Sequence, residues 1–282
     1  MTKENKPTVA ETLAQAKQYI QDVDAILITA GAGMGVDSGL PDFRGEKGFW
    51  KAYPLFKKLR FKFHDVASPY LFFDNPNLAW AFYGHRLNLY RNTEPHKGYE
   101  MLLDLVKAKG DNYFVYTTNV DGHFEKACFD TQKIYEVHGS IHKLQCNEPC
   151  QNDIWANDEQ VELDLKEMRA VNLPKCKNCG GLARPNILMF DDAHWLEYKA
   201  KEQNAKFQKW KDKVFKKNQK LAIIEIGAGL AVQTIRFNNN RLVHLNEANS
   251  KIIRINPKQS KTTRPMGWGL QMGAVEALEL LL

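Results

Sequence analysis

Residues 25–35 read AILITAGAGMG, an apolar run that passes directly into a glycine-rich turn. The apolar run has the length and composition of a buried strand. After such a strand, an α/β fold sets backbone amides and a helix N-terminus against a pyrophosphate. Small residues also favour a tight strand-to-helix turn that binds nothing, so this stretch alone leaves both interpretations open.

Three further apolar runs, at residues 113–117, 221–226 and 251–255, are bounded by turn signals and predict buried strands. Residues 9–20 and 101–106 carry apolar side chains at helical spacing. Strands that alternate with amphipathic helices predict an α/β fold with a parallel sheet. We therefore expect a Rossmann-like parallel sheet with helices on both faces.

Two segments interrupt this alternation, an aromatic-rich insert at 45–92 and a polar, cysteine-bounded insert that runs from Cys146 to Gly181. We expect them to form a smaller lobe. The predicted lobe consists of a helical insert, 45–92, and a zinc-binding module, 141–183. The predicted Rossmann-like domain then comprises residues 1–44, 93–140 and 184–282.

The continuation of the glycine turn argues against a hydride-transferring dehydrogenase. Such enzymes carry Gly or Ala at the sixth position of the motif and an acidic residue about twenty residues later, at a strand end. The sixth position here is Val36, and residues 51–54 offer neither an acid nor a strand.

Four of the five cysteines form two close pairs, Cys146-x3-Cys150 and Cys176-x2-Cys179. Four thiolates are the ligand set of a closed tetrahedral structural zinc. Close pairs within an odd number of cysteines fit metal binding in a reducing compartment better than a disulfide framework, so we expect a cytoplasmic protein. Cys128 is left over, and we expect it to be a buried thiol.

Size and charge narrow the class of protein further. A chain of 282 residues with 44% hydrophobic content can bury a large core. No stretch reaches the roughly eighteen apolar residues of a membrane span, and residues 1–7 are polar, so we expect neither membrane insertion nor secretion. The net charge of +6 is mild and its basic excess lies mainly in residues 199–220, where we expect a solvated helix face rather than a nucleic-acid site.

Several motifs recur in order along the chain. They are Gly39-Leu40-Pro41-Asp42-Phe43-Arg44, Thr117-Thr118-Asn119-Val120-Asp121, His138-Gly139, the stretch from Cys176 through Phe190, Gly227-Ala228-Gly229 and Ile255-Asn256. In this order and spacing they resemble the sirtuins, a family of zinc-stapled, NAD-consuming enzymes that remove acyl groups from lysine side chains. The resemblance covers nearly the whole chain.

The resemblance implies NAD and zinc as cofactors, acyl-lysine proteins or peptides as substrates, and nicotinamide and O-acyl-ADP-ribose as products. It implies catalytic roles for His138 and Asn119. A neutral imidazole suits His138 as the base that takes a proton from a ribose hydroxyl. The residues implied to bind NAD are Gly31, Ala32, Gly33, Asp42, Phe43, Arg44, Thr118, Asn119, Asp121, Gly227, Ala228, Gly229, Asn256 and Ala274. The implied zinc ligands are Cys146, Cys150, Cys176 and Cys179.

Asn119 and Asp121 have two interpretations. Their side chains can hydrogen-bond the nicotinamide carboxamide, which presents both a donor and an acceptor. Both residue types also favour helix caps at a strand-to-helix turn. One residue can serve each purpose.

Three residues of the aromatic-rich insert indicate which acyl group is removed. Tyr83 and Arg86 are three apart, so on a helix they lie on one face. Together with Ala67 they resemble the sirtuin branch that removes succinyl, malonyl and glutaryl groups, in which Arg pairs with the acyl carboxylate, Tyr donates a hydrogen bond and a small Ala leaves room. The simpler interpretation makes Tyr83 a core residue and Arg86 a surface cation, and without Ala67 it would be preferred.

The sequence departs from the family pattern in several places. Gly35, Thr118 and Gly229 differ beside the cofactor, and Asp191-Asp192 differs beside the peptide, where added negative charge would repel an acidic acyl-lysine. The segment after Asp121 differs as well, and we expect its His123 to pack in the core.

Two alternatives to a deacylase stay open. The 117–121 motif resembles the sirtuin branch that transfers ADP-ribose to proteins, although retention of His138 argues against it. The other alternative is a non-catalytic or NAD-hydrolysing module that senses NAD. The sequence does not indicate an oligomeric state.

Overall fold

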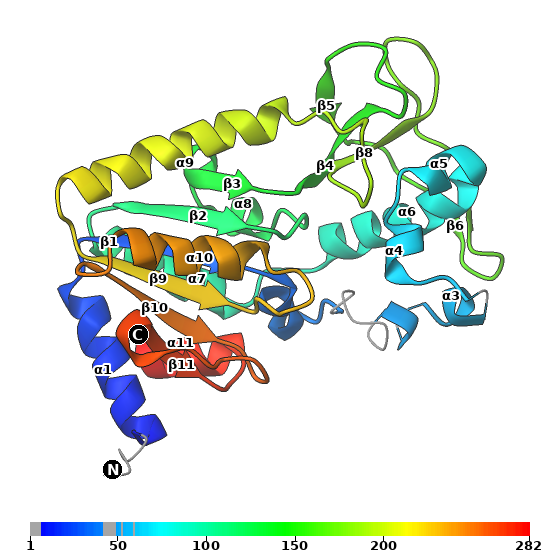
Figure 1. The fold of residues 1–282 in the computed structure, drawn as a ribbon. Coiled ribbons are helices and arrows are strands. Elements are labelled where there is room, and N and C mark those ends of the chain that lie inside the picture. The colour runs from blue at the N-terminus through cyan, green and yellow to red at the C-terminus, as the bar shows by residue number, and fades with distance from the viewer. Residues whose placement is uncertain (1–6, 42–48, 52, 59) are drawn as a thin grey trace.

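The computed structural model describes residues 7–41, 49–51, 53–58 and 60–282. Its centre is a six-stranded sheet in the order β11-β10-β9-β1-β2-β3, and every neighbouring pair is parallel (Figure 1). The four strands predicted from apolar runs all lie in this sheet. Its strands are β1 (Ala25–Ala30), β2 (Tyr113–Thr117), β3 (Ile134–Glu136), β9 (Leu221–Ile226), β10 (Ser250–Ile255) and β11 (Gly267–Leu270).

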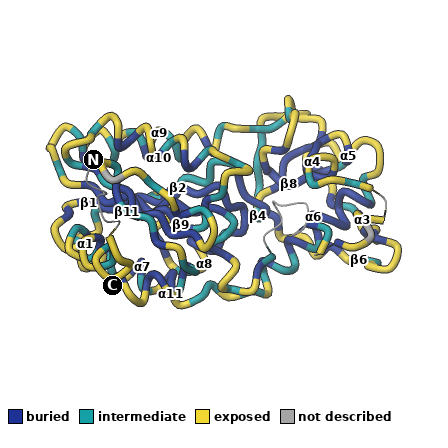
Figure 2. Tube along the Cα trace, turned by 60° about the horizontal axis from the view of Figure 1, so that its bottom comes forward, coloured by how far each residue is buried: buried dark blue, intermediate teal, exposed yellow. Residues whose placement is uncertain are grey.

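Helices cover both faces of the sheet, as predicted. Apolar side chains of α1, α7 and α11 share one core with Ile26 and Ile28, whereas α9 and α10 share another core with Ala25 and Leu27. Because successive strand residues point to opposite faces, one continuous apolar strand supplies both cores. Figure 2 shows the buried strands between the more exposed helices. These helices are α1 (Val9–Asp22), α7 (Lys97–Ala108), α9 (Tyr198–Lys216), α10 (Thr234–Leu245) and α11 (Ala274–Leu281).

A smaller lobe lies beyond the carboxyl ends of the parallel strands (Figure 1). It contains an antiparallel sheet in the order β5-β4-β8, a two-stranded β6-β7 ribbon and helices that pack around a core that includes Trp80 and Leu144. Because β8 pairs with β4, residues 183–187 lie in the sheet of the smaller lobe. The predicted division of the chain into a Rossmann-like domain and a smaller lobe stays a prediction. The elements are α3 (Pro54–Lys58), α4 (Phe63–Val66), α5 (Tyr70–Asp74), α6 (Pro76–Asn92), β4 (Gly139–Cys146), β5 (Ile154–Ala156), β6 (Leu163–Asp164), β7 (Arg169–Ala170) and β8 (Ala183–Ile187).

Helix α6 carries two of the candidate substrate residues. Its start is fixed locally, because the Asn75 side chain accepts a hydrogen bond from the Leu78 N–H at 3.0 Å and Pro76 occupies the first turn. Trp80 anchors the helix to the lobe sheet by donating its indole N–H to the Ala183 carbonyl at 2.9 Å. The side chains that α6 presents are therefore held by packing as well as by the helix itself.

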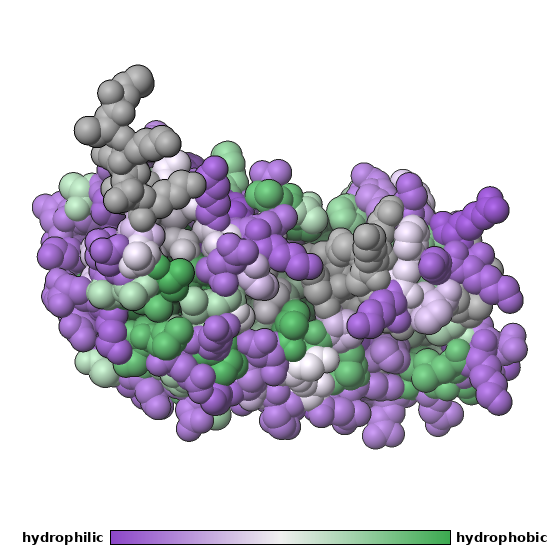
Figure 3. Space-filling model, turned by 90° about the horizontal axis from the view of Figure 1, so that it is seen from below, coloured by the Kyte–Doolittle hydropathy of each residue, from purple (hydrophilic) through white to green (hydrophobic). Residues whose placement is uncertain are grey.

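No helix in the described part of the chain combines the length and apolar character needed to cross a membrane. The face drawn in Figure 3 is largely hydrophilic, with apolar areas that are small and separate.

Candidate active site

The strand order of the main sheet reverses between β1 and β9. From β1 the chain proceeds outward through β2 and β3, and from β9 it proceeds in the opposite direction through β10 and β11. In open α/β sheets, ligands bind outside the carboxyl ends of the strands at such a switch point. The glycine turns that follow β1 and β9 therefore meet where a ligand site is expected.

The two glycine turns contact each other through their backbones. The Gly31 N–H donates to the Ile226 carbonyl at 2.9 Å, and the Gly33 N–H donates to the Gly227 carbonyl at 3.1 Å. Gly227 has φ +65°, and a Cβ there would lie 2.3 Å from the Met34 nitrogen. The turn after β1 continues into a 3-10 helix, η1 (Ala32–Ser38).

A cavity of about 490 Å³, here called the outer pocket, opens beside these turns. Five of the residues predicted to bind the cofactor line it, namely Gly33, Gly227, Gly229, Asn256 and Ala274. Gly31 and Ala228 bind two other predicted site residues through their carbonyl groups. The Gly31 carbonyl accepts from the Asn119 side chain at 3.0 Å, and the Ala228 carbonyl accepts from the Asn256 side chain at 3.1 Å.

Asn256 is engaged mainly in shaping the loop of the outer pocket. Its side-chain oxygen accepts from the backbone N–H groups of Lys258 and Gln259, at 2.9 and 2.8 Å. Arg236, from α10, also donates to the Ala228 carbonyl, at 2.7 Å. The role of Asn256 in cofactor binding thus stays a prediction, whereas its role in holding the loop is seen directly.

A buried ion pair that was not predicted stabilises the strands beneath this pocket. Glu225 and Arg254 are register partners in β9 and β10, and Arg254 Nε lies 2.6 Å from Glu225 Oε1. The Asn239 side chain donates to Glu225 and to the Thr29 hydroxyl. The sequence showed Glu225 in one apolar strand and Arg254 in another, but the register of the two strands was needed to pair them.

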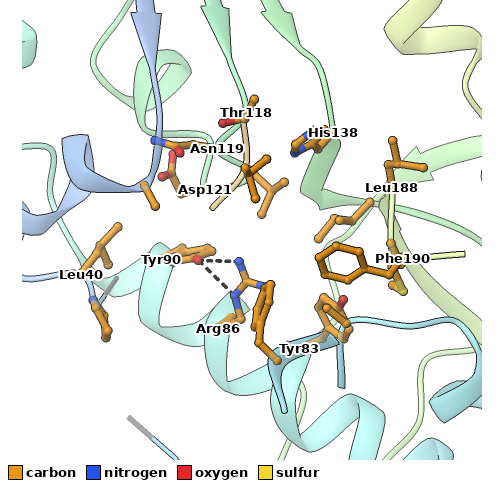
Figure 4. A pocket seen from close by; sticks show the side chains of 18 residues that line it. Leu40, Tyr83, Arg86, Tyr90, Thr118, Asn119, Asp121, His138, Leu188 and Phe190 are labelled. Atoms are coloured by element: carbon orange, nitrogen blue, oxygen red, sulfur yellow. Dashed lines mark hydrogen bonds between the residues drawn. The ribbon is translucent and has the colours of Figure 1, made fainter. Parts of the chain in front are cut away.

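A second cavity, of about 240 Å³ and here called the central cavity, lies between the main sheet and the smaller lobe (Figure 4). Val232 lines both cavities, so the central cavity and the outer pocket adjoin. The central cavity brings together eight of the predicted site residues: Ala32, Ala67, Tyr83, Arg86, Thr118, Asn119, Asp121 and His138. Asp42, Phe43 and Arg44 lie outside the described residues.

Asn119 and Asp121 enter the central cavity from the loop that follows β2. The Asn119 backbone N–H donates to the Thr117 hydroxyl at 3.0 Å, while its side chain is tied to Gly31. One Asp121 carboxylate oxygen accepts from the His123 N–H at 3.0 Å, at the start of α8 (His123–Lys126). This bond forms an Asx turn that leads into α8, whose N-cap residue is Gly122, and Asp121 also lines the cavity.

His138 lies in the connection between β3 and β4, and Figure 4 shows its ring at the edge of the central cavity. Its carbonyl accepts from the Leu188 N–H at 2.9 Å, which ties it to the strand that leaves the smaller lobe. Glu136, two residues earlier, has its pKa raised to about 7, mainly by burial. The backbone of the histidine is thus bonded to the segment that follows β8.

Tyr83 and Arg86 face the central cavity from α6. Ala67, the residue that follows α4, lines the same cavity. Burial raises the pKa of Tyr83 to about 12, so its phenol stays protonated and can donate. Burial works against the charge of Arg86, but the neighbouring phenols of Tyr90, Tyr83 and Tyr53 raise its pKa overall. Arg86 is 8% exposed, so it is not the surface cation of the simpler interpretation.

Tyr90 also lines this cavity and was not predicted. It lies one helical turn after Arg86, and that spacing of four was the only signal the sequence contained.

The expectation that Asp192 adds repulsive charge beside the peptide is wrong. Its carboxylate forms a two-pronged pair with the Arg184 guanidinium, with both hydrogen bonds at 2.8 Å and both side chains fully buried. The paired charge is neutralised within the smaller lobe. The neighbouring Asp191 is exposed, with 69% of its side chain accessible, and its carboxylate lies 3.7 Å from the His64 ring nitrogen Nε2.

We expect Asp192→Asn to lower the free energy of unfolding by about 3 kcal/mol, because it leaves the Arg184 charge buried without its counter-charge. Asp191→Asn is the matched control, since Asn tolerates the positive φ of 55° found there. Urea denaturation of both variants would measure the difference. Equal and small losses in the two variants would show that the buried pair adds little.

The four paired cysteines converge at one end of the smaller lobe. All four sulfur atoms lie within 4.8 Å of one another, and the Cys146–Cys179 and Cys150–Cys176 pairs are each 3.7 Å apart. With zinc–sulfur bonds of about 2.3 Å, tetrahedral geometry places sulfur atoms about 3.8 Å apart. The donor set and its spacing therefore fit a structural zinc.

Two further sequence expectations have opposite outcomes. His123 is fully buried, as expected, and within the described residues neither ring nitrogen has a hydrogen-bond partner. Burial is the largest cause of its lowered pKa.

The expectation for Cys128 is wrong, because this thiol is exposed at a turn with φ 64°.

Comparison with known proteins places these features in context. The model of the Sir2 family matches residues 31–233. An NAD-dependent protein deacylase of Aquifex aeolicus (strain VF5) is 33% identical over 168 residues, which are 60% of this chain and 62% of that protein. A probable bifunctional ADP-ribose hydrolase/ADP-ribosyltransferase of Fusarium oxysporum f. sp. cubense is 26% identical over 256 residues, which are 86% of this chain and 42% of that protein.

Among solved structures, a Sir2 homologue in complex with NAD shares the fold, with a TM-score of 0.72 and 23% identity. That similarity covers 95% of this chain and 92% of the other. The two sequence relatives are matched over less than two thirds of their own length.

Proposed function

This chain belongs to the Sir2 family, and on that basis we propose that it removes acyl groups from protein lysines in an NAD-dependent reaction. One observation carries the proposal. A single cavity holds the candidate base His138 and the candidate nicotinamide residues Asn119 and Asp121, and it also holds Tyr83 and Arg86 of the candidate acyl site (Figure 4). The acyl group and the cofactor would therefore meet beside the base.

The two adjoining cavities suit a ligand with two halves, such as NAD. The outer pocket, at the switch point of the sheet, would hold the adenosine half, and Asn119 and Asp121 would hold the nicotinamide carboxamide. Bound NAD would supply a ribose carbon that accepts the acyl oxygen as nicotinamide leaves. The predicted contacts of Asp42, Phe43 and Arg44 with NAD stay predictions.

His138 would take a proton from a ribose hydroxyl within this cavity. A neutral imidazole accepts a proton readily near neutral pH, which is what a general base at that pH requires. The bond between the His138 carbonyl and Leu188 fixes the backbone from which the ring projects. A fixed position matters for the proposed base, because a misplaced catalytic group loses much of its effect.

We propose that the preferred acyl group carries a carboxylate. Arg86 would pair with that carboxylate, the Tyr83 phenol would donate a hydrogen bond, and the small Ala67 would leave room for the acyl chain. The burial of Asp192 against Arg184 supports this proposal, because it removes one source of repulsion that the sequence suggested.

Selectivity between succinyl-lysine and acetyl-lysine peptides tests this part of the proposal. We expect wild-type protein with NAD to remove the succinyl group faster, and we expect Arg86→Met to reduce that preference about tenfold or more, since hydrogen bonds to charged groups contribute about 1.5 to 3 kcal/mol. Mass analysis of the peptides would give both rates. Equal wild-type rates, or an unchanged ratio in the variant, would rule out an arginine-read carboxylate.

ADP-ribosyl transfer to a protein is the second candidate. The fungal relative with that name and the 117–121 motif favour it, and the same cavities would hold the same cofactor. Its distinguishing product is a protein that has gained ADP-ribose.

A further inference from the structure

Tyr90 binds one edge of the Arg86 guanidinium. Arg86 Nε and Nη2 both donate to the Tyr90 phenol oxygen, at 3.1 and 2.9 Å (Figure 4). The two residues lie four apart on α6, and both are buried, at 8% and 5% exposure. Their contact is thus a defined hydrogen-bonded unit in the cavity wall.

This contact restricts how Arg86 can meet a ligand. A guanidinium pairs with a carboxylate through two parallel N–H groups on one edge. Because Tyr90 binds the Nε–Nη2 edge, a two-pronged pair with a carboxylate would not form through that edge.

Three aromatic rings also lie close to the Arg86 guanidinium. The Arg86 Cζ atom lies 5.2 Å from the centre of the Phe82 ring, 5.8 Å from that of Tyr83 and 5.5 Å from that of Tyr90. Cation–π contacts stabilise a cation most when it is removed from water, as this one is. The rings fix the position of the cation, and the Tyr90 hydrogen bonds fix its rotation.

We propose that Tyr90 is a positioning residue that orients Arg86 for an acyl group with a terminal carboxylate. This inference rests on the proposed function, and it adds a third residue to the Tyr83–Arg86 pair. A flexible arginine would lose conformational entropy each time it bound a carboxylate, and the preset orientation reduces that loss. Tyr90 therefore raises selectivity for acidic acyl groups through Arg86.

The competing explanation is that Tyr90 is an ordinary core tyrosine of the smaller lobe, where it belongs to the same apolar cluster as Phe82 and Leu87. A packing role would affect all acyl groups alike and would not depend on Arg86. A positioning role acts only through the guanidinium. Energetic coupling between Tyr90 and Arg86 therefore separates the two explanations.

The experiment measures binding of labelled succinyl-lysine and acetyl-lysine peptides by fluorescence anisotropy. The proteins are wild type, Tyr90→Phe, Arg86→Met and the double variant. We expect Tyr90→Phe to lower the ratio of succinyl to acetyl affinity about fivefold, in line with about 1 kcal/mol for a lost hydrogen bond. In the Arg86→Met background, the same change should alter the ratio less than about twofold.

Tyr116→Phe is the matched control, because it removes a phenol from a buried tyrosine that packs against Tyr135 and Phe207 on the far side of the sheet. The ratio should be unchanged in that variant. An unchanged ratio in Tyr90→Phe, or an equal fall with and without Arg86, would overturn the inference.

Turnover with NAD is measured on the same proteins. Selective binding without NAD-dependent removal of either group would contradict the proposed function but support the role of Tyr90. Turnover without an effect of Tyr90→Phe on the affinity ratio would do the reverse.

Discussion

His138→Ala is expected to slow NAD-dependent deacylation at least about a hundredfold, because a positioned general base contributes about 10² to 10⁴ in rate. The imidazole lies at the edge of the central cavity, opposite the proposed acyl site. The backbone bond between His138 and Leu188 does not involve the side chain and is kept in this variant.

NAD affinity separates loss of the base from loss of the site. We expect His138→Ala to bind NAD within a few-fold of wild type in calorimetric titration, because the proposed base acts after the cofactor is seated. His194→Ala, which changes an exposed histidine outside the cavity, is the matched control and should keep full activity. Near-normal turnover in His138→Ala would show that another group is the base.

Loss of zinc is expected to unfold the end of the smaller lobe that the cysteines hold together. We expect purified protein to contain one zinc per chain, bound by Cys146, Cys150, Cys176 and Cys179. Structural zinc contributes about 10 to 16 kcal/mol of apparent binding free energy in small domains, far more than any other single contact here. Cys176→Ser should therefore lose the metal and lower the melting temperature markedly.

Cys128→Ser is the control for the zinc prediction, because Cys128 is exposed and lies outside the cluster of four cysteines. It should keep both the metal and the melting temperature. Elemental analysis and thermal unfolding would be measured on both variants. Purified wild-type protein without zinc, or equal stability in the two variants, would contradict the assignment.

Local patterns in the sequence predicted the features that depend on neighbouring residues. The strand at 25–30 is an apolar run that ends in a glycine turn, and both properties are visible in a few residues. The paired cysteines were also predicted from local sequence, since their short spacing already indicates that they bind one metal ion. Arg86 and Tyr83 were grouped correctly because helical spacing places them on one face.

Features that depend on tertiary partners could not be predicted in this way. Asp192 and Asp191 are adjacent and chemically identical, but only Asp192 meets Arg184 across the turn that follows β8. The pairing of Glu225 with Arg254 requires the register of two parallel strands. Exposure of Cys128 was mispredicted because a thiol is usually buried, whereas this one lies in a turn.

The nucleotide formed when the protein is incubated with NAD and a succinyl-lysine or acetyl-lysine peptide tests the central claim most directly. Mass spectrometry of the nucleotide fraction should show O-acyl-ADP-ribose in amounts that match the deacylated peptide, and neither product should form without NAD. ADP-ribose attached to protein, with the peptide still acylated, would instead identify a transferase. Free ADP-ribose with an unchanged peptide would identify an NAD hydrolase, and either result would contradict lysine deacylation.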